Sequence, residues 1–189
     1  MSVRMLSFRI RKHWLVIGVL ALAVLGASAV YGRLKAERPD SAAMFIAGPL
    51  APDISGTVTF HNVPGGTVVS VEVEGLPPYQ PGDPPIGPFG FHIHEHGICE
   101  VGDPANPFAA AGGHWNPDNQ PHGNHAGDLP VLFSHQGIAR MAFFTDRFTA
   151  DEVVGRSIII HMHPDDYRTQ PAGDSGPRLA CGIIVRYAK

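Results

Sequence analysis

Cysteine is scarce in this chain: its 189 residues include only two, Cys99 and Cys181. Two isolated cysteines exclude CxxC redox chemistry and a zinc site built from thiolates. The chain also lacks an internal repeat, and beyond its N-terminal region no segment places apolar side chains at a period of 3.6 residues. Helix bundles and solenoids are therefore not expected.

Basic residues are few once the N-terminus is set aside. The whole chain has 14 Lys and Arg against 17 Asp and Glu, a net charge of −3. Residues 1–29 hold four of the basic residues and no acid, so the rest has ten basic against seventeen acidic residues, a net charge of −7. We expect neither nucleic acid nor an anionic membrane surface as a partner.

The N-terminus has the pattern of an export segment. Four basic residues, Arg4, Arg9, Arg11 and Lys12, precede an apolar run that begins at Trp14, and 27–29 (ASA) fits an A-x-A cleavage site. Residues 14–31 would span a bilayer if left uncut. We expect a signal peptide or N-terminal membrane anchor over 1–31, a linker over 32–42 and one domain over 43–189, in the periplasm or at the cell exterior. There, Cys99 and Cys181 are expected to form a disulfide.

Short segments typical of strands fill the exported part, and two of them, 54–61 and 67–76, alternate apolar and polar residues. Expected strands cover AAMFIAG near its start and then 54–61, 67–76, 90–96, 131–133, 138–144, 157–161 and 179–187. Long stretches rich in Gly, Pro, Asn and Asp separate some of them, at 97–129 and 164–177. This pattern predicts an all-β antiparallel sandwich or barrel of about eight strands with two long functional loops.

Histidine is concentrated where those loops meet the strands. Six of the eleven histidines lie within residues 91–128, and His161 and His163 form a second H-x-H. Residues two apart on a strand point to the same face, so His92 and His94 can offer two imidazoles to one ion. A solvated polar face would explain a single H-x-H, but not the further cluster of His114, His122, His125, Asp128 and His161. The cluster predicts a zinc or copper site.

Six motifs in this order and spacing resemble the copper-zinc superoxide dismutases. They are GFHIHEHG (90–97), GGHWNP (112–117), HxxD (125–128), GRSIIIH (155–161), DD (165–166) and GPRLACG (176–182). The resemblance covers about residues 43–187. It implies an eight-stranded Greek-key sandwich of immunoglobulin-like architecture, a fold that includes this family.

The resemblance also implies the metal ligands. The copper ligands would be His92, His94, His114 and His161. The zinc ligands would be His114, His122, His125 and Asp128, so that His114 bridges the two ions. Asp165 would tie His92 to His122 and fix their tautomers. Arg178 would stand beside the open copper position and attract and orient the substrate anion, although a surface salt bridge is the simpler role for an arginine.

The implied activity is the disproportionation of superoxide to dioxygen and hydrogen peroxide, by alternate reduction and oxidation of the copper ion. A protein of the same fold that binds or buffers copper without turnover is the alternative, although it would need neither Arg178 nor the bridging His114. The short zinc loop resembles bacterial exported members, so either a monomer or a bacterial-type dimer is expected.

Four histidines and one loop stand apart from the family pattern. His96 and His163 could be extra ligands, but we expect them to be solvated or to support the ligands. His61 and His135 are expected to lie on the surface. The segment 165–178 is short and lacks lysine, and it carries Asp174 and Ala172. We therefore expect weaker steering of superoxide than in members with longer loops.

Overall fold

The computed structural model describes residues 38–187. The predicted export segment and most of the predicted linker lie outside these residues. Strand β1 begins at Ser41, two residues before the expected start of the domain. Within the described range, no helix has the length and apolar character needed to cross a membrane.

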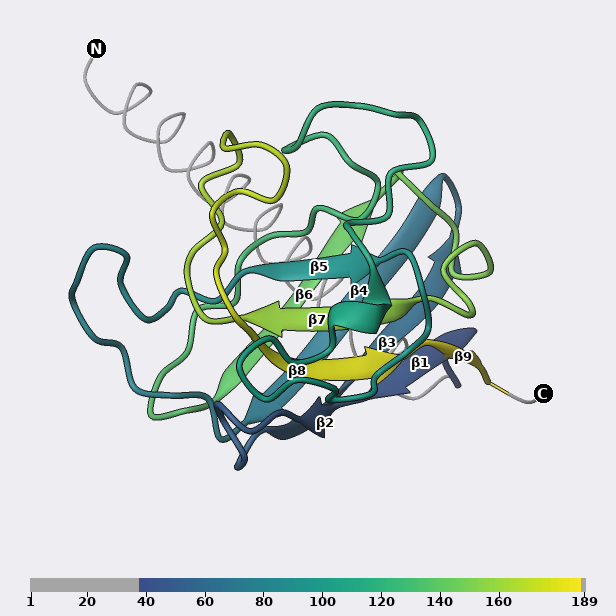
Figure 1. The fold of residues 1–189 in the computed structure, drawn as a ribbon. Coiled ribbons are helices and arrows are strands. Elements are labelled where there is room, and N and C mark those ends of the chain that lie inside the picture. The colour runs from purple at the N-terminus through teal and green to yellow at the C-terminus, as the bar shows by residue number, and fades with distance from the viewer. Residues whose placement is uncertain (1–37, 188–189) are drawn as a thin grey trace, which may run out of the picture. The chain divides into compact units, whose positions relative to one another are not determined.

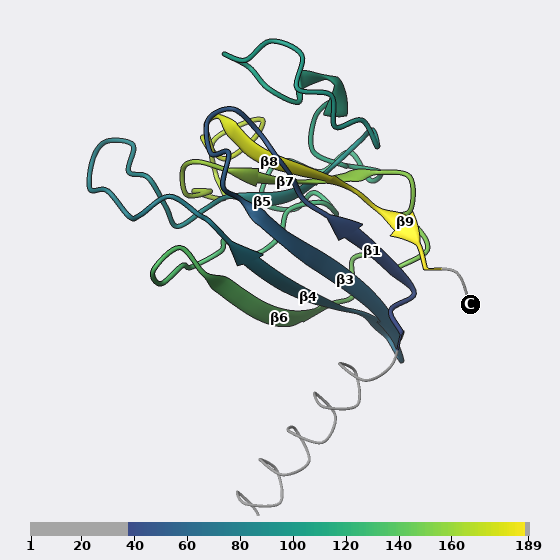
Figure 2. The same cartoon turned by 90° about the horizontal axis from the view of Figure 1, so that it is seen from below.

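Nine strands form two antiparallel sheets that face each other (Figures 1 and 2). The first sheet has the order β6-β4-β3-β1-β9, and its strands are β1 (Ser41–Met44), β3 (Ser55–Val63), β4 (Gly66–Glu74), β6 (Ala139–Thr145) and β9 (Val185–Arg186). The second has the order β2-β8-β7-β5, with β2 (Ile46–Ala47), β5 (Phe91–His94), β7 (Ser157–His161) and β8 (Arg178–Ile183). A single turn of 3-10 helix, η1, spans Ala109–Ala111.

The β3–β4 hairpin shows why the alternating segments become strands. Val63 pairs with Gly66 across a two-residue turn, and Gly65 there adopts a φ of 89°, which favours glycine. Because successive side chains point to opposite faces, Val58 and Phe60 enter the core while Thr57 and Thr59 face outward. The apolar residues that fill the space between the two sheets are thus set by a period of two.

The expected all-β Greek-key fold is confirmed, with two differences in the strands. The first expected strand divides at Phe45, because the chain crosses from one sheet to the other between β1 and β2, and the last divides at Ile184 in the same way. The two divisions add two strands and the expected strand at 131–133 is missing, so nine strands replace eight. Residues 131–133 do not form a strand; Leu132 makes only an isolated bridge with Phe89. Pro130 precedes this segment and cannot donate to a ladder.

The first long loop returns twice to the edge of β5. His94 forms an isolated bridge with His114, and His92 forms one with Asp128. Trp115 donates its amide to the carbonyl of Ile93 at 2.8 Å, which holds the returning segment beside the strand. These pairings bring residues of the loop next to the H-x-H of β5.

Candidate metal centre

Two groups of four potential ligands meet at the edge of the second sheet. The first consists of His92, His94, His114 and His161, and the second of His114, His122, His125 and Asp128. Within each group the candidate ligand atoms lie within 4.8 Å of one another, and all seven residues are buried. His114 belongs to both groups. The two groups have the same members as the copper and zinc sets predicted from the sequence.

In the first group, hydrogen bonds to one ring nitrogen of His92, His94 and His161 leave the other ring nitrogen available for a metal ion. His94 bonds the carbonyl of Gly112 through Nδ1 at 3.0 Å, and His161 bonds that of Gly176 through Nδ1 at 3.1 Å. Their Nε2 atoms are left facing each other at 3.2 Å. His92 is reversed, because its Nε2 contacts Asp165 and its Nδ1 has no hydrogen-bond partner in the described structure.

The second group converges on Nδ1 atoms and one carboxylate. Oδ1 of Asp128 lies 2.9 Å from Nδ1 of His114 and 3.4 Å from Nδ1 of His125. Its Oδ2 lies 3.2 Å from Nδ1 of His122 and also accepts the backbone amides of Gly123 and His125. Three imidazoles and one carboxylate form a closed tetrahedral donor set, which zinc prefers.

The donor sets fit metal ions because they leave buried nitrogens unpaired. Five buried side-chain polar atoms in the described residues lack a hydrogen-bond partner, and four of them belong to these histidines: His92 Nδ1, His114 Nε2, His122 Nδ1 and His125 Nδ1. An unpaired buried polar atom is costly, whereas two metal ions, one in each group, would satisfy all four. His114 presents Nδ1 to the second group and Nε2 to the first, as a bridge requires.

Asp165 connects the two groups by contacting one histidine of each, on the ring nitrogen that is not the candidate ligand atom. Its Oδ2 lies 2.7 Å from Nε2 of His92, and its Oδ1 lies 2.9 Å from Nε2 of His122. Both side chains of the first contact are fully buried. Gly173, with a φ of 65°, passes so close that a side chain there would collide with the Asp165 carboxylate and the His122 ring. The carboxylate therefore fixes the proton on Nε2 of each histidine and leaves each Nδ1 free to coordinate.

Burial favours the neutral form of His92, His94 and His161 in the first group by lowering the pKa of each. Desolvation, followed by repulsion from His114, lowers the pKa of His161 to about 3. Desolvation also lowers the pKa of His92 and of His94, and neighbouring histidines add to the effect. Burial opposes ionisation of Asp128, but the hydrogen bond with His114 and the nearby histidines outweigh it, so the pKa of this carboxyl is lowered. Neutral imidazoles and an ionised carboxylate are the forms that bind metals.

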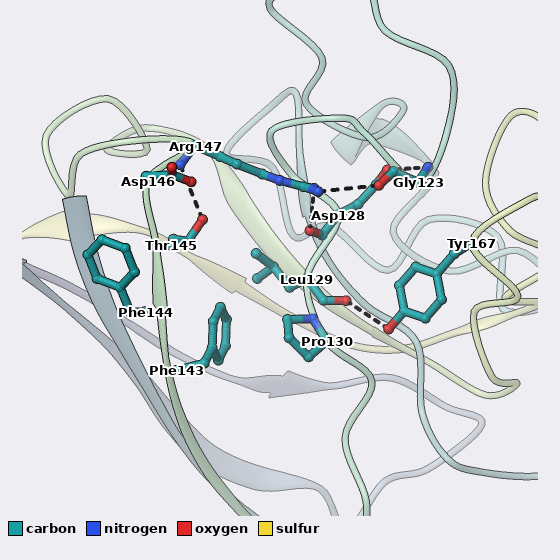
Figure 3. Close-up of a pocket in the computed structure, with 10 residues that line it drawn as sticks. All are labelled: Gly123, Asp128, Leu129, Pro130, Phe143, Phe144, Thr145, Asp146, Arg147 and Tyr167. Carbon is teal, nitrogen blue, oxygen red and sulfur yellow. Dashed lines mark hydrogen bonds between the residues drawn. The ribbon is translucent and has the colours of Figure 1, made fainter. Parts of the chain in front are cut away.

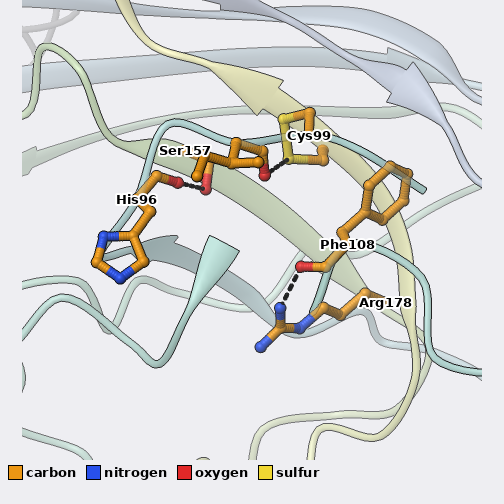
Figure 4. The surroundings of a disulfide bond; sticks show 7 residues. His96, Cys99, Phe108, Ser157 and Arg178 are labelled. Atoms are coloured by element: carbon orange, nitrogen blue, oxygen red, sulfur yellow. Dashed lines mark hydrogen bonds between the residues drawn. A yellow bond between two sulfur atoms is a disulfide. The ribbon is translucent and has the colours of Figure 1, made fainter. Parts of the chain in front are cut away.

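Arg178 is fixed beside the first group by two main-chain oxygens. Nη1 donates to the carbonyl of Phe108 at 2.5 Å, and Nη2 donates to that of Gly112 at 2.6 Å. Figure 4 shows the first of these bonds next to the Cys99–Cys181 disulfide, which confirms the expected pairing. Burial lowers the pKa of Arg178, but a guanidinium keeps its charge in proteins. The disulfide therefore secures the loop whose carbonyls hold the arginine.

The other four histidines among the described residues, His61, His96, His135 and His163, lie outside both ligand groups. His96 is exposed, and His163 is half-buried, with Nδ1 2.8 Å from the carbonyl of Pro85. His135 is exposed, as expected. The expectation for His61 was wrong, since only 7% of this residue is accessible. The strand period predicts that it faces away from the core, but it does not reveal what covers that face.

Two residues that contact the second group were not predicted. Gln170 accepts the backbone amide of His122 through Oε1 at 2.9 Å. Arg147 donates to the carbonyls of His125 and Asp128. Both side chains bind main-chain atoms of residues at least 19 positions away, so no local sequence motif could reveal them.

Comparisons with known proteins agree with this geometry. The family model for copper/zinc superoxide dismutase (SODC) matches residues 54–184. The superoxide dismutase [Cu-Zn] of Deinococcus radiodurans is 42% identical over 148 residues, covering 69% of this chain and 77% of that protein. The superoxide dismutase [Cu-Zn] of Neisseria meningitidis is 38% identical over 143 residues, covering 68% of this chain and 73% of that protein.

A solved structure gives the same result for the fold. The Cu/Zn superoxide dismutase from Brucella abortus matches with a TM-score of 0.62 and 31% sequence identity, over 76% of this chain and 98% of that one. Sequence, fold and ligand geometry agree, and the chain belongs to the copper/zinc superoxide dismutase family.

Proposed function

We propose that the two donor groups hold copper and zinc in an exported superoxide dismutase. Copper is assigned to His92, His94, His114 and His161, and zinc to His114, His122, His125 and Asp128. The observation that carries the assignment is His114, whose two ring nitrogens face different donor groups while both groups remain buried. An all-imidazole set suits a redox-active copper, and a closed set with a carboxylate suits zinc.

The reaction is the disproportionation of superoxide to dioxygen and hydrogen peroxide. Bound copper supplies the one-electron redox couple that accepts an electron from one superoxide and returns it to another. The protein must admit a small anion, orient it and provide protons, and its own side chains perform these tasks.

Arg178 is the group that receives the anion. Its two bonds to main-chain carbonyls fix the guanidinium in one orientation beside the four-histidine group. A fixed positive charge in a partly desolvated position attracts superoxide more strongly than a mobile surface lysine would. This local charge acts at short range, although the domain as a whole is acidic.

His114 and Asp165 control protons within the centre. Nε2 of His114 can carry a proton whenever it is not coordinated, and it is the atom of the zinc set that faces the copper group. Asp165 holds the protons of His92 and His122 on Nε2, away from the ligand atoms. Nε2 of His114 is thereby left as the nitrogen between the two groups that can take up a proton.

The disulfide and the N-terminal sequence support export. Disulfides persist outside the cytoplasm, and residues 1–31 have the pattern of a signal peptide or a membrane anchor. We assign residues 32–42 to a linker and 43–189 to the enzyme domain, which works in the periplasm or at the cell exterior.

A paired measurement tests the function. Superoxide turnover and metal content would be measured for the exported domain loaded with copper and zinc, and for a His161→Ala variant. We expect fast turnover in the wild type, and loss of copper and turnover with zinc retained in the variant, because His161 belongs to the copper set alone. Stoichiometric copper binding without turnover in the wild type would instead identify a copper-binding protein of the same fold.

A further inference from the structure

Arg147 is outside both donor groups, yet its side chain is bonded to the segment that carries two zinc ligands. Nη1 donates to the carbonyl of His125 at 3.0 Å and to that of Asp128 at 3.2 Å. Nη2 lies 3.4 Å from the carbonyl of Gly123. Figure 3 shows the guanidinium reaching across to Asp128 and Gly123. One planar group thus holds both ends of the turn from His125 to Asp128.

The base of this side chain is fixed by the core. Arg147 follows β6, and its amide donates to Oγ1 of Thr145 at 3.2 Å. The next residue, Phe148, is buried, and its ring lies 6.3 Å from that of Phe60 and 6.0 Å from that of Trp115. The guanidinium therefore extends from a backbone that cannot easily shift.

The turn is held from its inner side as well. Oδ2 of Asp128 accepts the amides of Gly123 and His125 at 2.8 and 3.0 Å. Those bonds satisfy N–H groups, whereas the carbonyls of the same segment point outward to Arg147. The bonds to Asp128 depend on a carboxylate that zinc would also bind. The bonds from Arg147 involve only main-chain carbonyls, which are not metal ligands. Arg147 can therefore hold the turn whether or not metal is present.

The carbonyls are the partners that the structure gives this arginine. Among residues 38–187, no carboxylate forms an ion pair with Arg147. Arg140, which lies on β6 itself, differs, since its Nη2 lies 3.8 Å from Oε1 of Glu74 and its side chain is 64% exposed. Arg147 is also exposed, so its bonds compete with water. The planar guanidinium favours these bonds because its N–H groups can reach several carbonyl oxygens at once.

We propose that Arg147 is a positioning residue for zinc, which pre-arranges His125 and Asp128 through their main-chain carbonyls. The inference rests on the zinc assignment made above. It predicts an effect on one metal only, because three of the copper ligands lie on β5 and β7 and are positioned by the pairing of these two strands. The fourth, His114, is held separately by its bridge to His94.

Metal affinities of three variants test the proposal. Zinc and copper dissociation constants would be measured by competition with chromophoric chelators for the wild type, Arg147→Gln, Arg147→Lys and the control Arg140→Gln. We expect zinc binding to weaken about tenfold in Arg147→Gln and less in Arg147→Lys, with copper binding unchanged in both. The control should bind both metals as the wild type does, because its arginine contacts no ligand residue.

Hydrogen exchange of the metal-free proteins provides a readout independent of metal. The amides of residues 123–128 should exchange faster in Arg147→Gln than in the wild type, while those of β3 and β4 keep their protection. Unchanged zinc affinity, an equal loss of both metals, or full rescue by lysine would overturn the proposal. A wild type that binds no zinc would overturn the zinc assignment and the proposal together.

Discussion

Arg178 and His94 share one acceptor: the carbonyl oxygen of Gly112 lies 2.6 Å from Nη2 of the arginine and 3.0 Å from Nδ1 of the histidine. The proposed anion-binding charge and a proposed copper ligand are therefore positioned by the same peptide group. Gly112 has a φ of 79°, and a side chain there would contact Glu95 and His96, so glycine suits this position. Displacement of this peptide would move the substrate site and the metal site together.

Two Arg178 variants distinguish the effect of its positive charge on the rate from the effect of its fixed orientation. We expect Arg178→Leu to lower kcat/KM for superoxide by roughly 10- to 100-fold without loss of metal, because local electrostatic steering is removed. Arg178→Lys should retain part of the rate, since an ammonium keeps the charge but cannot bond both carbonyls as the fork does. Stopped-flow rates at increasing salt would measure this. A leucine variant as fast as the wild type would refute the assigned role.

Asp165→Asn tests the link between the two metal groups. The amide can accept a hydrogen bond through one atom only, so His92 or His122 loses its fixed tautomer. Zinc affinity should fall by about 10- to 100-fold. Chelator competition would measure the change, and Asp166→Asn is the matched control because Asp166 bonds residues 168 and 169 and not a ligand. Equal zinc affinity in the two variants would contradict this role.

Removal of both metals should make the protein sensitive to mild acid. The folded-state pKa of His161 is about 3, against 6.5 for an ordinary histidine, so between these values the unfolded chain binds a proton that the folded chain does not. The stability contributed by a neutral His161 is thus complete above pH 6.5 and is lost as the pH falls toward 3. Each such histidine contributes a slope of about 1.4 kcal/mol per pH unit. Urea unfolding of the metal-free protein at pH 8 and pH 5 would measure it. Equal stability at both values would contradict the prediction.

Loss of the disulfide should destabilise the domain and leave Arg178 less firmly positioned. Cys99 and Cys181 are 82 residues apart, and closure of such a loop contributes up to about 4 kcal/mol. We expect Cys99→Ser with Cys181→Ser to lower Tm by roughly 10 °C. Turnover per bound copper should also fall, because the loop that presents the carbonyls of Phe108 and Gly112 is released. Calorimetry and turnover assays would test both effects, and unchanged turnover per copper would contradict the second.

The sequence predicted the strands and the ligands to different degrees. The β3–β4 hairpin follows from alternation and a glycine turn, and the seven ligands follow from family motifs. The break of the first strand at Phe45 was not predictable, because the apolar run AAMFIAG continues without interruption across the point where the chain changes sheets. Arg147 and Gln170 were missed because they bind main-chain atoms, which every residue offers.

The ligands are also arranged in an order along the chain. The zinc set ends at Asp128, whereas the copper set needs His161, which follows 33 residues later. In a chain that crosses a membrane from its N-terminus, His92 and His94 would emerge first, the zinc set would be complete at Asp128, and the copper set would be complete only at His161. The order of translocation thus allows zinc to be captured while the copper site is still unfinished.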